Sequence, residues 1–323
     1  MSNSKRQHFV PQFLLRQFAD EGGQHIYVFD KRTSRVFRAN ISKVAAENRI
    51  YDFDIDNLTA SIEPGLAEFE SKAADVLRRT LAAQSLERIT ILERTFLAAF
   101  VAQLLLRSPH RQALCDDMVY QAREKIRKMG TDPDKLAELK ILDANETKIM
   151  TVSFLTDVWT EFIPIIALKT WVFHRVSQSE ILYLSDNPVV MHNEMQFGPR
   201  GNLGLAVKGV EVYLPLSSSS CLAMYCPEMT TDLERKYREM QSSSEFLDRT
   251  PFPGRREIVE ELFAAFRTGR PMPFDSSNVE FVNSLQVWSA ERYIYAARDN
   301  FELAKDMLGK NPQLKFGPRA SVV

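Results

Sequence analysis

The chain has 323 residues, of which 45% are hydrophobic, and its formal net charge at pH 7 is -1. This length can bury a sizeable core in one large domain or two smaller ones, and the balanced charge gives no overall attraction to nucleic acid or to an anionic membrane. The three cysteines lack CxxC spacing and no apolar run approaches the length of a membrane span, so we expect a cytoplasmic protein without disulfides or membrane association.

The beginning of the chain predicts a short helix followed by strands. Apolar residues recur at helical spacing across 11–18, and Pro11 suits the first helical turn. Aromatic and β-branched residues then fill 24–30, 35–41 and 48–55, as is typical of strands. These three segments predict a small N-terminal antiparallel sheet.

The middle of the chain has a different pattern of apolar and charged residues. Apolar residues recur every three to four positions, and many charged residues are placed for i,i+4 pairs. The pattern predicts long helices over 62–81, 90–107, 109–128 and 146–166.

The last part predicts a second antiparallel sheet and C-terminal helices. Strand-like segments are separated by Gly, Asn, Pro and Ser, and they lie at 170–176, 181–184, 189–192, 210–216 and 221–225. Helical spacing follows at 232–242, 256–268 and 277–297.

Together these elements predict an α+β fold with a small N-terminal antiparallel sheet, a central bundle of long helices, a second antiparallel sheet and C-terminal helices. No internal repeat or long linker marks a domain boundary. We therefore expect one domain over 1–309, made of the segments 1–56, 57–169 and 170–309, and a tail over 310–323.

His8 stands just before the first predicted helix, where free backbone amides and the helix dipole favour an anion. The basic residues Lys5, Arg6 and Arg16 lie close in sequence and would strengthen a phosphate or carboxylate site. The alternative is that His8 caps the helix or packs against the sheet, because a single histidine without metal-ligand spacing is a weak signal.

Glu63 and Glu70 are two helical turns apart on one predicted helix, so their carboxylates project on the same side. Such a pair could ligate Mg²⁺ or Mn²⁺, or act as acid and base. Acidic residues in the first turns of a helix also favour its dipole and face solvent, which is the alternative reading.

Gln103 and Arg107 form a polar pair at i,i+4 in an otherwise apolar helix. A buried polar pair needs partners, and Arg107 could reach an acidic group such as Glu63 or Asp186, or hold a phosphate bidentately. The alternative is a structural ion pair between helix and sheet.

Asp186 and Asn187 follow a predicted strand and precede Pro188, which fixes a turn. Polar groups at a strand end are held rigidly and suit ligand binding, although an Asx-Pro turn without chemistry fits the pattern equally well. The chain contains no nucleophile elbow, P-loop, dinucleotide fingerprint or zinc-binding helix.

The segment 8–18 (HFVPQFLLRQF) resembles the opening His-aromatic-Val-Pro motif of the bacterial domain-of-unknown-function family 4238. The likeness runs nearly full length, through the pairs Glu63 with Glu70 and Gln103 with Arg107, and through the blocks 27–31, 48–52, 185–188, 215–217 and 283–296. The resemblance implies membership of a family defined by sequence and brings no reaction with it.

The candidate residues favour a metal-dependent phosphodiesterase, such as a nuclease of a bacterial defence or toxin system that acts on nucleic acid or a nucleotide. This hypothesis requires His8 and Asp186 to share one water-accessible cavity. The alternative is a non-enzymatic sensor or interaction module in which the same residues form a structural buried polar network. The enzyme hypothesis assigns catalysis to His8, Gln103, Arg107, Asp186 and Asn187, binding of Mg²⁺ or Mn²⁺ to Glu63, Glu70 and Asp186, and binding of phosphate to Arg16 and Lys31.

Overall fold

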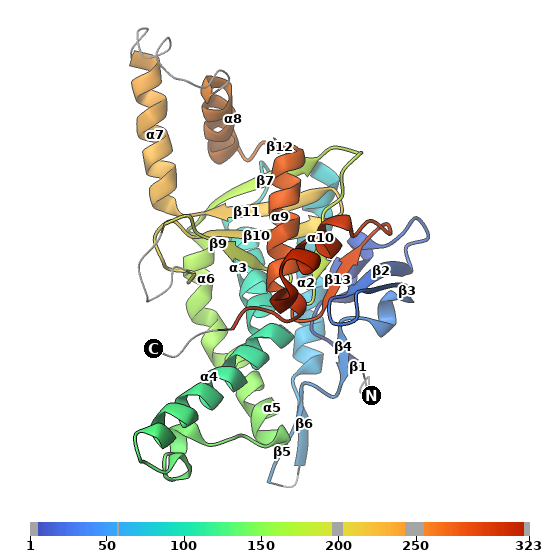
Figure 1. Cartoon of the computed structure of the whole chain (residues 1–323). Helices are drawn as coiled ribbons and strands as arrows, with labels where there is room; N and C mark the ends of the chain where they lie inside the picture. The colour runs from blue at the N-terminus through green and yellow to red at the C-terminus, as the bar shows by residue number, and fades with distance from the viewer. Residues whose placement is uncertain (1–5, 57, 196–202, 243–254, 320–323) are drawn as a thin grey trace.

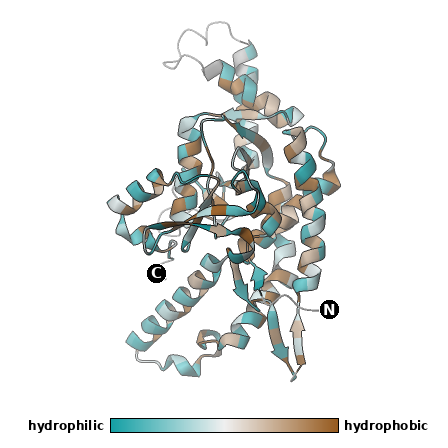
Figure 2. Ribbon diagram, turned by 90° about the vertical axis from the view of Figure 1, so that its right-hand side faces the viewer, coloured by the Kyte–Doolittle hydropathy of each residue, from teal (hydrophilic) through white to brown (hydrophobic). Residues whose placement is uncertain are grey.

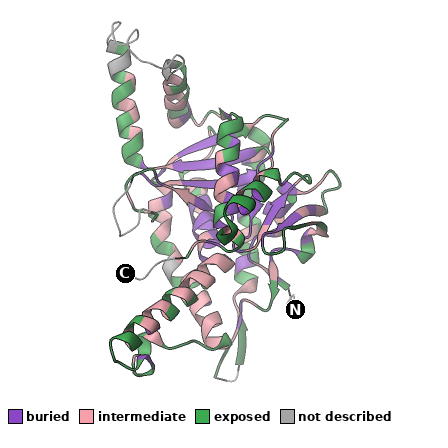
Figure 3. Ribbon diagram, in the orientation of Figure 1, coloured by how far each residue is buried: buried purple, intermediate pink, exposed green. Residues whose placement is uncertain are grey.

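The computed structural model describes residues 6–56, 58–195, 203–242 and 255–319, which form an α+β fold (Figure 1). Many of the buried residues lie in the two larger sheets, whereas α4 (Pro109–Lys128) and α7 (Pro227–Ser242) project from the body (Figures 1 and 3). The helices around the sheets carry both hydrophilic and hydrophobic residues (Figure 2), as expected of elements with one face toward a core. The α+β class predicted from the sequence is confirmed.

The five-stranded sheet comes from the second half of the chain. Its strand order is β12-β7-β11-β10-β9, with β12 parallel to β7 and the other neighbours antiparallel. Its strands are β7 (Thr170–Val176), β9 (Val190–His192), β10 (Glu211–Ser217), β11 (Ser220–Tyr225) and β12 (Met272–Phe274).

The four-stranded sheet joins segments from both ends of the chain, in the order β3-β2-β13-β8. Its strands are β2 (His25–Asp30), β3 (Arg35–Asn40), β8 (Leu184–Ser185) and β13 (Tyr293–Ala296). The N-terminal sheet is therefore completed by strands that the sequence analysis assigned elsewhere.

The helix predicted over 277–297 is wrong in its last part. The helix α9 (Ser276–Ser289) ends at Ala290, whose ψ of 133° is not helical, and Tyr293–Ala296 becomes the strand β13. This strand pairs with β2 on one side and with β8 on the other. Pairing on both sides, together with its aromatic and β-branched composition, outweighs the helical spacing of its apolar residues.

Two short two-stranded ladders complete the N-terminal part of the chain. The strand β1 (Arg6–His8) pairs with β4 (Ala46–Asn48), and β5 (Asp52–Ile55) pairs with β6 (Leu58–Ser61). The strand predicted over 48–55 is thus divided, because the backbone of Arg49 adopts a φ of 51°. As a result, neither half joins β2 and β3, and β4 instead holds β1.

The helices predicted in the middle of the chain are confirmed to within a few residues. Thr90 and Glu93 form a capping box at the start of one helix, and Ser108 caps the next, which begins at Pro109. A π-helical turn, Phe154–Val158, divides the predicted helix over 146–166. The helices not yet named are α1 (Gln12–Leu15), α2 (Glu63–Ala83), α3 (Ile91–Leu106), α5 (Ala144–Ser153), α6 (Trp159–Ala167), α8 (Arg255–Thr268) and α10 (Glu302–Lys310).

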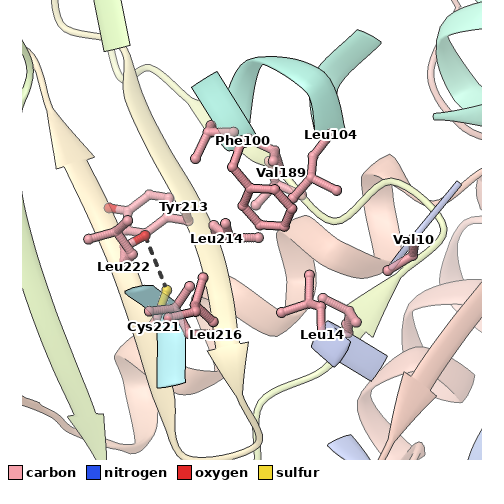
Figure 4. Close-up of a cluster of buried hydrophobic side chains, with 14 of the residues drawn as sticks. Val10, Leu14, Phe100, Leu104, Val189, Tyr213, Leu214, Leu216, Cys221 and Leu222 are labelled. Atoms are coloured by element: carbon pink, nitrogen blue, oxygen red, sulfur yellow. Dashed lines mark hydrogen bonds between the residues drawn. The ribbon is translucent and has the colours of Figure 1, made fainter. Parts of the chain in front are cut away.

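The main core includes the start of the chain. Phe100 and Leu104 of α3 belong to one buried cluster with Leu14 of α1 and with Leu214 and Leu222 of the five-stranded sheet (Figure 4). Complete burial of one such side chain contributes about 1.5–3 kcal/mol. The segment that follows β1 is therefore firmly anchored, which fixes the position of the strand before it.

Of the tail expected over 310–323, the structure describes 310–319, which lie against the body, and 320–323 are outside the described residues. A short 3-10 turn, Pro312–Lys315, follows α10. Beyond it, Arg319 donates hydrogen bonds to both carboxylate oxygens of Glu291, at 2.8 and 2.9 Å.

None of the described helices is by itself long and apolar enough to cross a bilayer. One bent pair, Ala144–Asp157 with Trp159–Ala167, meets the criteria of length and composition when its two parts are taken together.

Candidate functional site

The histidine of the N-terminal motif lies at the end of a short strand. His8 is paired with Ala46 of β4, and the amide of the next residue, Phe9, donates to the carbonyl of Ala45 at 2.9 Å. The imidazole forms a hydrogen bond with the backbone of Ile41, while its Nε2 has no partner among the described residues. The ring is thus held in place, and its second nitrogen is buried beside the cleft without a hydrogen-bond partner.

A cleft of about 300 Å³ separates this N-terminal segment from α2. Glu63 and Glu70 lie on the α2 wall, as their two-turn spacing predicts. The facing wall is formed by His8, Gln12, Phe13 and Arg16. The structure therefore brings four candidate residues into one cleft: His8, Arg16, Glu63 and Glu70.

A buried ion pair lies behind the acidic wall. The side chain of Arg107 is completely buried, and its Nη1 donates to Oε1 of Glu70 at 2.6 Å. Across the described ranges, Nε and Nη2 of Arg107 and Oε1 of Gln103 find no hydrogen-bond partner. Each unsatisfied buried polar atom costs about 1–3 kcal/mol, so the arrangement is poorly suited to a purely structural role.

The surroundings of the cleft shift the pKa values of Glu63 and His8 in opposite directions. Burial and the neighbouring carboxylate of Glu70 raise the pKa of Glu63 to about 7. Burial, together with the positive charges of Arg6 and Arg107, lowers the pKa of His8 below its usual 6.5. Near neutral pH, His8 is therefore uncharged and can accept a proton, whereas Glu63 retains its proton in a substantial fraction of molecules.

Two supporting residues were missed by the sequence analysis. Gln7 is completely buried, donates to Oδ1 of Asp52 at 2.7 Å, and accepts the amide of Tyr51 at 2.7 Å. Tyr51, also completely buried, donates its hydroxyl to the carbonyl of His8 at 3.3 Å. In the sequence, only the position of Gln7 next to His8 points to its supporting role. Its partners, Tyr51 and Asp52, lie more than forty positions away.

Asp186 lies outside the cleft and fixes the turn between α9 and β13. Its Oδ1 accepts the backbone amide of Glu291, and its Oδ2 accepts the amides of Arg292 and Tyr293, each at 2.8 Å. Burial raises the pKa of Asp186 to about 6 despite these bonds. Both oxygens are therefore engaged by the backbone.

The neighbours of Asp186 are tied to the same helix. Asn187 donates its side-chain amide to the carbonyl of Ser289 at 3.3 Å, and Gln286 donates to the carbonyl of Pro188 at 2.9 Å. These contacts join the strand end after β8 to α9, which is a structural connection.

Lys31, predicted to bind phosphate, caps the end of α9. It is completely buried, and its Nζ donates to the carbonyls of Val287 and Ala290, both at 2.6 Å. Burial lowers the pKa of Lys31 to about 8, and a cation at a helix C-terminus is favoured by the helix dipole. We refer to Lys31 and the block 185–188 together as the α9 corner.

The three carboxylates predicted to bind a metal are not brought together. Glu63 and Glu70 line the cleft, whereas Asp186 lines a different cavity. Within the part of the chain that the structure describes, no group of three or more His, Cys, Asp and Glu side chains is placed to hold a metal ion. Contrary to the expectation from the sequence, His8 and Asp186 do not share one cavity, because the backbone amides before β13 bind Asp186 elsewhere.

Comparison with known proteins identifies the family to which the chain is similar. The family described as "Protein of unknown function (DUF4238)" matches residues 6–300, which include both the cleft and the α9 corner. No curated protein and no solved structure matches the chain.

Proposed function

The chain belongs to the DUF4238 family, whose description names no activity, and we propose from the chemistry of its cleft that it is a phosphodiesterase. A nuclease of a bacterial defence or toxin system is the form of this activity to test first, with nucleic acid or a nucleotide as substrate. The supporting observation is that His8, a neutral base, and Glu63, a carboxyl with its pKa raised to about 7, line the same cleft. Acid and base on one cleft are what hydrolysis of an ester requires.

In the proposed reaction, Nε2 of His8 takes a proton from water as the water oxygen attacks phosphorus. Glu63 donates its proton to the leaving oxygen as the old P–O bond breaks. The cycle closes when the proton on His8 returns to Glu63 through solvent. The products are a phosphomonoester and an alcohol.

The other residues of the cleft bind and position. Arg16 supplies positive charge on the wall that carries His8 and can hold a phosphate oxygen. The ion pair of Arg107 with Glu70 fixes the carboxylate whose negative charge helps to raise the pKa of Glu63. Arg107 is thus a positioning residue.

Metal dependence was predicted from Glu63, Glu70 and Asp186, and the cleft offers two of these carboxylates. Oxygen donors of this type are those that Mg²⁺ and Mn²⁺ prefer. A reaction that depends on a metal and one that uses only the acid and base differ in their response to a chelator, so the assay below separates them.

The test is hydrolysis of bis(p-nitrophenyl) phosphate, single-stranded RNA and double-stranded DNA by the full chain, with Mg²⁺, with Mn²⁺ and with EDTA. We expect His8→Gln and Glu63→Gln each to lower kcat by about 10² to 10⁴-fold, the usual contribution of one acid or base. Glu68→Gln is the matched control, because Glu68 is exposed on the same helix and pairs with Lys72.

Failure of the wild-type chain to cleave any of these substrates would reject the proposal, as would full activity of His8→Gln. Activity that survives EDTA assigns the reaction to the acid and base alone. Activity that EDTA abolishes and Mg²⁺ or Mn²⁺ restores would show a metal-dependent reaction, with the carboxylates of Glu63 and Glu70 as the ligands that the cleft offers, and would rule out Glu63 as the proton donor.

The α9 corner favours a second candidate function, a non-enzymatic sensor or interaction module. Its hydrogen bonds account for Lys31, Asp186 and Asn187 without any chemistry. Calorimetric binding of a dinucleotide with a phosphorothioate linkage, in the absence of any turnover of the natural linkage, would support this sensor over the enzyme.

A further inference from the structure

A second cavity, of about 530 Å³, lies between the four-stranded sheet and the β1–β4 ladder. It shares no lining residue with the cleft that contains His8. Its volume is in the range of about 300–1,000 Å³ that is usual for small-molecule sites. The proposed hydrolysis does not use it.

The strand register places this cavity on one face of the sheet. Tyr295 of β13 is paired with Val28 of β2, which is paired with Phe37 of β3, and paired residues point to the same face. Phe9, which follows β1, and Ala45, which precedes β4, close the opposite side. The other face of the sheet packs against α10 and is filled.

The cavity is too large to be a packing defect. Protein interiors are packed as densely as organic crystals, and few of their voids exceed a water molecule. Part of the wall is made by side chains that are themselves almost fully buried, with exposed fractions of 5% for Phe9, 1% for Val28 and 0% for Tyr295, and the ring of Phe37, 43% exposed, lies at the open side. Rigid apolar walls of this kind are typical of a small-molecule site.

The hydroxyl of Tyr295 points to a ligand. The residue is completely buried; the backbone amide of Ala45 lies near the phenol oxygen, but the hydroxyl proton has no acceptor among the described residues. A buried tyrosine usually has a partner, and phenylalanine would fill the same space without an unsatisfied group. An acceptor atom on a bound molecule would satisfy this hydroxyl.

The charges at the cavity favour an anion. Three of its exposed lining residues are basic, Arg6, Arg32 and Lys43, and one is acidic, Glu47. Arg32 already pairs with Glu291 at 3.4 Å, so the charges that favour an anion are those of Arg6 and Lys43. Lys43 forms no ion pair within the described ranges. The two buried carboxylates of the lining are already bound, Glu291 by Arg319 and Asp186 by backbone amides.

We propose that this cavity binds a small organic anion with a planar apolar body. The body packs between Phe9 and Val28, an acceptor atom receives the hydroxyl proton of Tyr295, and the negative group lies near Lys43 and Arg6 at the exposed end. The site is independent of the cleft and of the proposed phosphodiesterase activity.

The test uses two fluorescent probes with nearly the same rings. Anilinonaphthalene sulfonate carries a negative group, and phenylnaphthylamine lacks it. We expect the sulfonate to bind the full chain with a stoichiometry of one and to bind more tightly than the neutral probe. Lys43→Gln should weaken binding of the sulfonate about threefold to tenfold and leave the neutral probe unchanged.

Two further variants locate the site. Ala39→Phe places a ring in the cavity from β3, at the edge of the sheet, and should abolish binding of both probes. Tyr295→Phe should weaken binding of the sulfonate about threefold to tenfold while changing the melting temperature little, because the hydroxyl proton has no acceptor among the described residues. Arg16→Gln, in the cleft, is the control and should bind both probes as the wild type does.

Unchanged binding of the sulfonate by a folded Ala39→Phe would overturn the proposal, because the probe would then lie elsewhere. Equal affinities for the charged and neutral probes, unaffected by Lys43→Gln, would overturn the assignment of an anion. Neither result bears on hydrolysis in the cleft, whose variants are separate.

Discussion

The cleft beside α2 and the α9 corner each contain a carboxyl with a raised pKa, about 7 for the half-buried Glu63 and about 6 for the buried Asp186. Their surroundings differ in how far the polar atoms are satisfied. Both oxygens of Asp186 accept backbone amides at 2.8 Å. In the cleft and behind it, Nε2 of His8 and two nitrogens of Arg107 have no partner among the described residues. A perturbed pKa is therefore common to both regions, and the unused hydrogen-bonding capacity beside it is what distinguishes the cleft.

The same difference suggests how each region contributes to stability. A fully satisfied buried network holds segments together, and here it joins the end of β8 to α9 and to the start of β13. A partly satisfied cluster costs free energy unless a ligand completes it. Substitutions should therefore lower stability in the corner and lower activity in the cleft.

The largest expected effect is a loss of protein stability caused by a substitution in the α9 corner. Asp186→Asn removes the negative charge opposite buried Lys31 and places an amide group where backbone amides need an acceptor. Breaking one partner of such a buried network costs about 3 to 5 kcal/mol in the free energy of unfolding. Urea denaturation at neutral pH measures this loss.

The control for this prediction is Glu63→Gln, which should not lower the free energy of unfolding under the same conditions. Equal and small losses for both variants would mean that the corner does not hold the fold together. If the Asp186→Asn variant stays folded but loses hydrolytic activity, Asp186 would have a role in catalysis after all.

The next effect is the pH dependence of hydrolysis. The active form needs His8 neutral and Glu63 protonated, so kcat/KM should fall at low pH as His8 gains a proton and fall again as pH rises above about 7. Each limb should approach a tenfold change per pH unit, and the maximum should lie slightly below neutral pH. Because Gln cannot titrate, Glu63→Gln should lose the alkaline limb while keeping the acid one.

A rate that keeps rising through pH 8 would contradict the assignment of Glu63 as the acid. Glu68→Gln should reproduce the wild-type profile, since Glu68 is exposed and its partner is Lys72.

The sequence predicted the cleft better than the corner, and the reason is physical. Glu63 and Glu70 were placed on one side of a helix because helical geometry fixes the direction of residues seven apart. The partners of Asp186 are backbone amides of residues 291–293, which carry no side-chain signature. The sequence therefore contained no local pattern to show that Asp186 is bound by these amides and lies apart from His8.

The fold shows the same limit. Spacing of apolar residues along single helices predicted α2 and α3 to within two residues at either end. The strand β13 was taken for the end of a helix, because its identity depends on pairing with β2, more than 250 residues earlier in the chain. Local periodicity carries no information about such a distant partner.

The smallest expected effect is a gain in stability from a cleft variant. The pKa of Glu63 is raised by folding from its usual 4.5 to about 7, so the folded state binds this proton more tightly than the unfolded state. Its stabilising contribution is complete below about pH 4.5 and is lost as pH rises through about 7. Glutamine keeps the hydrogen-bonding capacity of the protonated carboxyl at every pH. Glu63→Gln should therefore match the wild type near pH 4 and exceed it near pH 8 by about 1 to 2 kcal/mol, a value reduced for the partial exposure of the side chain.

Urea denaturation of both proteins at the two pH values measures this difference, and Glu68→Gln should show no gain at pH 8, because its pKa is lowered by Lys72. A folded Glu63→Gln that is less stable than the wild type near pH 8 would mean that the ionised carboxylate of Glu63 stabilises the fold. The cleft would then resemble the α9 corner, and the contrast from which the enzymatic proposal follows would disappear. A gain confined to high pH has the opposite meaning, because it shows that the fold tolerates an unfavourable charge next to Glu70 at the position where the proposed reaction needs a proton donor.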